Sequence, residues 1–80
     1  MNLEEALICF QASWANNTHI SFAHEGEACS LQHYVRDDGC RYCRLKVGKD
    51  LYPVYLGTIY EIEHIIRRAQ INQINRILSE

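Results

Sequence analysis

The sequence predicts an α+β domain: a four-stranded antiparallel meander with an N-terminal helix and a long C-terminal helix on one face (α-β-β-β-β-α). The central part of the chain contains runs that alternate apolar and polar residues, and turn signals separate them. Apolar residues recur at helical spacing at both ends. Eighty residues are enough for one small domain, so residues 1–80 are expected to fold as a single unit.

The first helix is expected over residues 3–15. Asn2 and Glu5 have the spacing of a capping box, in which each side chain binds the other residue's backbone N–H. Asn16-Asn17 ends the helix, because Asn tolerates the left-handed conformation. The apolar side of this helix would consist of Leu3, Ala6, Leu7, Phe10 and Trp14.

A strand at residues 18–23 comes next, and a turn at Glu25-Gly26 would pair Phe22 with Cys29. The central hairpin covers residues 29–47 and closes at Asp37-Asp38-Gly39, a three-residue loop with Gly in the left-handed position. This register pairs Arg36 with Cys40, Tyr34 with Tyr42, His33 with Cys43, Leu31 with Leu45, and Cys29 with Val47. One face then carries Cys29, Leu31, His33, Val35, Cys43, Leu45 and Val47. The other carries Ser30, Gln32, Tyr34, Arg36, Cys40, Tyr42, Arg44 and Lys46.

A fourth strand is expected after a turn at Lys49-Asp50. Pro53 lacks a backbone N–H and therefore predicts that this strand lies at an edge of the sheet. The expected pairs are Val47 with Tyr52, Leu45 with Val54, and Cys43 with Leu56.

A long helix over residues 59–78 follows Gly57, with Thr58 and Glu61 as a second capping box. Its first half would pack on the sheet through Ile59, Ile62, Ile65, Ile66 and Ala69. A second apolar stripe lies roughly 100–130° further round the helix. Twenty helical residues reach about 30 Å and a seven-residue strand only about 23 Å, so the last two turns are expected to overhang the sheet or to bend across its end. The second stripe consists of Ile71, Ile74, Ile77 and Leu78.

The composition, 48% apolar and 22% charged, is typical of a folded soluble protein. The net charge of −2 gives no global attraction to nucleic acid or to an anionic membrane. No apolar run approaches the roughly 20 residues that span a bilayer, and the N-terminus lacks the basic region of a signal peptide. We therefore expect a cytoplasmic protein with reduced cysteines and no membrane partner.

A metal site is suggested by the spacing of Cys29, His33, Cys40 and Cys43. The predicted strand argues against it, because Cys40 and Cys43 would point to opposite faces and Cys29 lies about 13 Å from His33. We expect no metal and no cofactor, and a zinc-stabilised module remains an alternative.

His33 opposite Cys43 would lack a third orienting group, and no phosphate loop or serine elbow is present, so we expect a non-enzyme without catalytic residues.

Two candidate binding surfaces remain. The open sheet face would present Tyr34, Arg36, Tyr42, Arg44, Lys46 and Tyr55, which suit an acidic protein surface or nucleic-acid bases and phosphates. These residues could equally stabilise a solvated sheet face through their cross-strand contacts. The stripe Ile71, Ile74, Ile77 and Leu78 would form a homodimer or partner contact, or would cover the end of the core near Trp14.

The preferred interpretation is a small non-enzymatic binding protein, a stoichiometric inhibitor or adaptor that acts on a larger protein or nucleoprotein partner. Proteins of this size with such roles are common on phages and other mobile elements, which is an argument by analogy. The small negative net charge favours a protein partner. A nucleic-acid-binding regulator that uses the Tyr/Arg face is the alternative.

Overall fold

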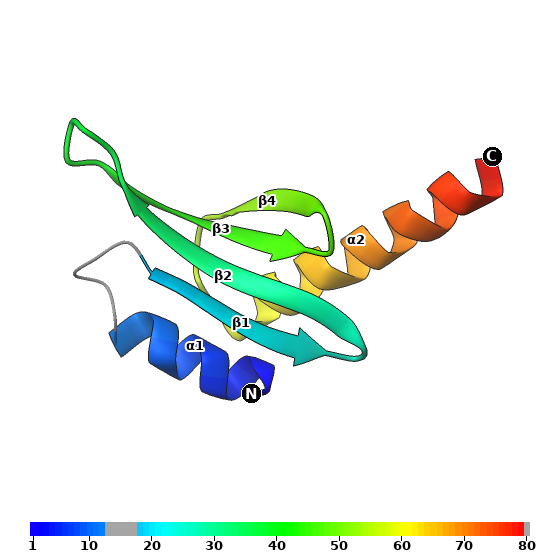
Figure 1. Ribbon diagram of the computed structural model, residues 1–80, viewed down its shortest axis with the longest axis horizontal. Coiled ribbons are helices and arrows are strands. Elements are labelled where there is room, and N and C mark those ends of the chain that lie inside the picture. The colour runs from blue at the N-terminus through cyan, green and yellow to red at the C-terminus, as the bar shows by residue number, and fades with distance from the viewer. Residues whose placement is uncertain (13–17, 80) are drawn as a thin grey trace.

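The computed structural model describes residues 1–12 and 18–79 (Figure 1). It confirms the predicted order of elements and the antiparallel sheet with strand order β1-β2-β3-β4. The expected helix residues 13–15, with Trp14, and the proposed end at Asn16-Asn17 lie outside the described residues. The elements are α1 (Leu3–Ala12), β1 (Thr18–His24), β2 (Glu27–Val35), β3 (Arg41–Val47), β4 (Asp50–Val54) and α2 (Ile59–Ser79).

Turn chemistry explains the first two hairpins. Glu25 and Gly26 both adopt positive φ, 50° and 82°, as a type I′ turn requires, and Phe22 pairs with Cys29 as predicted. Gly39, at φ 86°, closes the central hairpin. The Arg36 N–H donates to the Cys40 carbonyl at 2.8 Å, and the predicted register of β2 against β3 is confirmed throughout.

The predicted register of β4 is wrong by two residues. The loop is Gly48-Lys49, so Val47 pairs with Asp50, and Gly48 at φ 60° supplies the first central position of a type II′ turn. A shift of two leaves every side chain on its predicted face. The observed pairs are Leu45 with Tyr52 and Cys43 with Val54, and Leu56 lies beyond the strand.

The core forms between the sheet and the two helices, which lie on one face of it (Figure 1). Leu31, Leu45 and Val47 of the sheet are fully buried, as are Ile62 and Ile66 of α2. The predicted alternation is therefore confirmed at the centre of the sheet. Val35 is an exception: it is 40% exposed on the helix-facing side, near the hairpin end of β2.

Helix α2 continues well beyond the sheet, as the length argument predicts (Figure 1). Its buried residues end at Ala69, and Arg76 forms an ion pair with Asp50 at the β3–β4 turn. Neither helix in the described part is long and apolar enough to cross a bilayer.

Candidate binding surface on the open face of the sheet

Tyr34 is the centre of an ordered cluster on the face that the helices leave uncovered. Its ring stacks on Tyr42, with centroids 5.5 Å apart and planes 18° apart, and it meets His19 edge to face. Its hydroxyl donates to Gln32 Oε1 at 2.9 Å and lies 3.3 Å from His19 Nε2. Contacts within β2 and to β1 and β3 therefore fix the orientation of this ring.

Arg44 completes this cluster. Its guanidinium carbon lies 4.2 Å from the centroid of the Tyr34 ring, a cation–π geometry. Arg44 Nε is buried and finds no hydrogen-bond acceptor among the residues that the structure describes. The guanidinium is thus held against an aromatic ring, while its buried Nε is unsatisfied within the described residues.

The charged strand residues of the open face are basic, and they are Arg44 and Lys46 on β3. In the observed register, none of the described strand residues that point to this face is a carboxylate. Glu27, the first residue of β2, pairs with His24 on the helix-facing side, and Asp37 and Asp38 lie in the loop between β2 and β3. The local charge is therefore opposite in sign to the net charge of −2. The residues of this face are His19, Ser21, Ala23, Ala28, Ser30, Gln32, Tyr34, Tyr42, Arg44, Lys46, Leu51 and Pro53.

A groove of about 410 Å³ opens on this face, beside the end of β4. It exists because β4 ends at Val54, whereas β3 extends two residues further, to Arg41. We call it the β3–β4 groove. The residues that line it from the open face are Tyr42, Arg44, Leu51, Pro53 and Tyr55. Four residues at helix-facing positions of β3 and β4 line it as well: Arg41, Cys43, Tyr52 and Val54.

The loop after β4 is held by the Glu61 carboxylate. It accepts three backbone N–H groups, from Tyr55 at 2.9 Å, Leu56 at 2.9 Å and Gly57 at 2.8 Å. Burial acts to raise the pKa of the Glu61 carboxyl, but these three donors together bring it below its ordinary value. The predicted capping box at Thr58 is therefore only half present: the Thr58 hydroxyl accepts the Glu61 N–H, while the carboxylate turns to the preceding loop.

Glu61 was not predicted as part of any site, because the capping pattern explained it fully. Its consequence is that Tyr55 stands 82% exposed on a loop that is fixed by three hydrogen bonds. The first turn of α1 does follow prediction, with the Glu5 N–H on Asn2 Oδ1 at 2.8 Å and the Asn2 N–H on Glu5 Oε1 at 3.3 Å.

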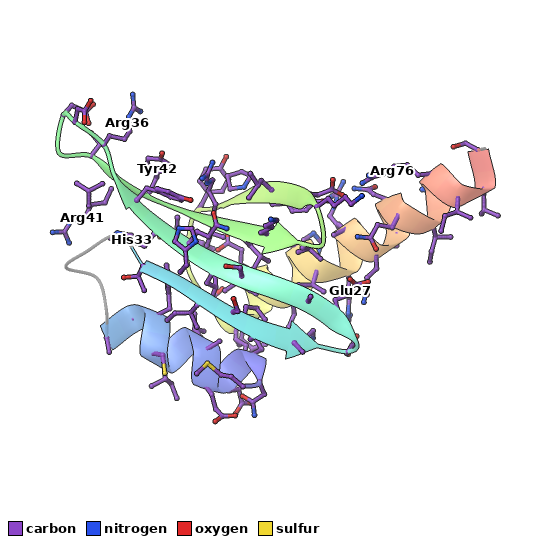
Figure 2. All side chains as sticks on the ribbon, in the orientation of Figure 1. Glu27, His33, Arg36, Arg41, Tyr42 and Arg76 are labelled. Carbon is purple, nitrogen blue, oxygen red and sulfur yellow. The ribbon has the colours of Figure 1, made fainter. Side chains whose placement is uncertain are left out.

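Four of the six predicted sheet-face residues gather around the groove or the Tyr34 cluster: Tyr34, Tyr42, Arg44 and Tyr55. Arg36 sits higher on the hairpin and shares a smaller hollow of about 250 Å³ with Tyr42 (Figure 2). Lys46 lies on the same face but towards the other end of β3, beside Ser21 and Ser30. The predicted surface is therefore a strip along β3.

The predicted helical stripe is exposed. Ile71 and Ile74 are each 55% exposed, and Ile77 and Leu78 more so, on the part of α2 that overhangs the sheet. Arg76 points from the same turns to Asp50, so the ion pair and the stripe occupy different sides of the helix (Figure 2).

All four cysteines lie within the part of the chain that the structure describes. Within residues 1–12 and 18–79, no group of three or more His, Cys, Asp and Glu side chains has the geometry to hold an ion.

Burial, with the nearby charge of Glu27, raises the pKa of the Cys29 thiol to about 11. Burial, with the charge of Glu61, also raises the pKa of the Cys43 thiol. Such thiols are poor nucleophiles at neutral pH, which weighs against the pairing of Cys43 with His33 as a catalytic dyad.

Comparisons with protein-family models, curated proteins and solved structures find no match to this chain. The fold and the surface together define a class only: a small α+β domain with an uncovered, basic and aromatic sheet face. The functional argument below rests on that face.

Proposed function

We propose that this protein is a non-enzymatic binding protein that attaches to a larger protein partner through the open sheet face, as an inhibitor or an adaptor. The observation that carries the proposal is the Tyr34–Tyr42–Arg44 cluster, which its own contacts order on a face whose described strand residues include no carboxylate. Tyr and Arg dominate the energetics of protein interfaces. Side chains that are already immobilised lose less conformational entropy when a partner binds, which favours affinity.

Charge supports a partner with an acidic surface. The strip from Arg36 through Arg44 to Lys46 is positive, while the chain as a whole is slightly negative. Such a patch steers the encounter with a negative surface and disfavours other approaches. In this proposal the partner is a cytoplasmic protein or nucleoprotein, and binding masks or bridges a site on it.

A single-stranded nucleic acid is the second candidate for the same face. One observation favours it: aromatic rings and guanidinium groups alternate along a flat strip, which is how sequence-tolerant single-strand binders stack bases. One observation weighs against it, because Tyr34 is already engaged by Tyr42, Arg44 and His19. The most exposed rings near the groove are then Tyr42, at 41%, and Tyr55.

The stripe on α2 is proposed as a contact between two copies of the chain. Ile71, Ile74 and Leu78 follow the 3–4 spacing of a coiled-coil seam, and the overhang keeps this seam clear of the sheet. A two-fold arrangement would leave both open sheet faces available.

A photo-crosslinking amino acid at Tyr42 tests the principal proposal in cells of the native source. The same probe at Gln11, exposed on α1, is the matched control. We expect a discrete protein adduct from Tyr42 that survives nuclease treatment and is missing from Gln11. Identical adducts from both positions, or only nuclease-sensitive adducts, would contradict a protein partner on this face.

A further inference from the structure

We propose that the β3–β4 groove binds an extended acidic segment of the partner, with one large apolar side chain of that segment seated in the groove. This inference rests on the proposed function and names the chemistry that the open face recognises. Three independent features of the groove support it.

The first feature is its apolar lining. Leu51 and Pro53 lie exposed on the open face of β4, and the rings of Tyr42 and Tyr55 stand beside them. At about 410 Å³ the groove lies within the range, roughly 300–1,000 Å³, that binds small organic groups. Because Glu61 fixes the backbone of Tyr55 by a hydrogen bond, the groove does not depend on the partner for its shape.

The second feature is the charge around the groove. Arg44 forms part of the lining, and the Tyr34 ring holds its guanidinium in place. Arg41 lines the hairpin end, and Arg36 lies just beyond it (Figure 2). Guanidinium groups bind carboxylates with two parallel hydrogen bonds, so acidic residues on either side of an apolar anchor would complement this arrangement.

The third feature is the backbone of β3. The Arg36 N–H bonds to the Cys40 carbonyl, and the Gly48 N–H bonds to the Ala28 carbonyl. These two bonds fix the alternation of the ladder, so the backbone groups of Arg41 point away from β2 towards the side of β4. The described ladder between β3 and β4 stops at Cys43, which leaves room beside Arg41 for an extended segment.

A titration of the ¹⁵N-labelled protein, followed by NMR, tests the inference with defined probes. The test peptide is a capped heptamer with one central Trp between Asp and Glu residues. One control replaces the Trp by Ser, and a second keeps the Trp but replaces every acid by its amide. A twelve-nucleotide oligothymidine is the nucleic-acid probe.

We expect the acidic Trp peptide to shift the signals of Arg41, Tyr42, Arg44 and Tyr55, and each control peptide to bind at least about tenfold more weakly. Leu51→Glu places a negative charge in the groove at an exposed position and should weaken binding by a similar factor. Ile8→Glu, the same change on the exposed side of α1, should leave binding unchanged.

Each other outcome overturns the inference. The groove is excluded if the peptide shifts other residues, if the amide control binds equally well, or if neither peptide binds. It is also excluded if oligothymidine binds the same residues more tightly than the peptide. If the peptides fail while Tyr42 still captures a protein in cells, the groove chemistry is wrong and the proposed function stands. If Tyr42 captures no protein, the proposed function itself fails.

Discussion

The Arg44 guanidinium carbon lies 4.2 Å from the centroid of the Tyr34 ring, and this pair links the open face of β2 to that of β3. Tyr34 also stacks on Tyr42 and bonds to Gln32, so it contributes to stability as well as to the surface.

Replacing Tyr34 by Ala should lower the free energy of unfolding by about 2 kcal/mol, because the ring loses its stacking, cation–π and hydroxyl contacts together. Tyr55→Ala removes a ring of the same size that is almost fully exposed, and should change stability by less than about 0.5 kcal/mol. Urea unfolding of both variants measures the difference. Equal effects would show that the Tyr34 cluster is not ordered in the unbound protein.

The Glu61 carboxylate gives the fold a pH dependence. Its pKa is lower in the folded state than its ordinary value of about 4.5, so it stabilises the fold fully above that value. The contribution is lost as pH falls from there through the lowered folded value. Glu61→Gln should therefore cost about 1–2 kcal/mol at pH 7, and the cost should become smaller as the pH falls below about 4.5. Chemical denaturation of both proteins at several pH values measures this. The control, Glu63→Gln, alters a neighbouring carboxylate that makes none of the three loop bonds. A pH-independent difference for Glu61→Gln would contradict the role of its charge.

The alkylation rates of the four cysteines test which face of the sheet each strand side chain points to. Cys29 is buried with a pKa of about 11, so its thiolate fraction at pH 8 is on the order of one in a thousand. Cys9 and Cys40 are exposed. Alkylation at pH 8, followed by mass spectrometry, should label Cys9 and Cys40 rapidly and leave Cys29 and Cys43 protected until the protein unfolds. Rapid labelling of Cys29 would place it on the wrong face. If Cys40 is protected from alkylation and a chelator removes this protection, the alternative of a zinc-stabilised module would be supported.

The helical stripe predicts self-association. Ile74→Asp places a charge at a position that is 55% exposed, so the fold should survive while the contact between copies is lost. Light scattering after size exclusion should show a dimer for the wild type and a monomer for the variant. Ile66→Asp, in the core, is the contrasting variant and should unfold the chain. A wild type that is monomeric at high micromolar concentration would contradict the dimer.

The sequence was sufficient to predict the element order, the faces of the sheet and two of the three strand registers, because Gly26 and Gly39 stand where hairpins need positive φ. The third register was wrong, because the turn was placed at Lys49-Asp50 and a shift of two residues preserves the side-chain pattern that could have revealed the error.

The residues of the open face could be predicted from the sequence, but the contacts between their side chains could not. Strand pairing places Tyr34 opposite Tyr42, whereas the position of Arg44 over Tyr34 depends on side-chain rotamers that spacing cannot give. The β3–β4 groove was missed because it depends on where β4 ends. The loop after that end is held by Glu61, whose spacing from Thr58 was already explained by a capping box.

The most direct test of the proposed binding face is the affinity of the protein captured from Tyr42, measured for two double variants with the same change of charge. Arg36→Ala with Arg44→Ala removes two positive charges from the open face, and Arg67→Ala with Arg68→Ala removes two from α2. We predict a loss of about 30-fold or more for the first, with a weaker dependence on salt, and less than about twofold for the second. Equal losses for the two variants would contradict the account.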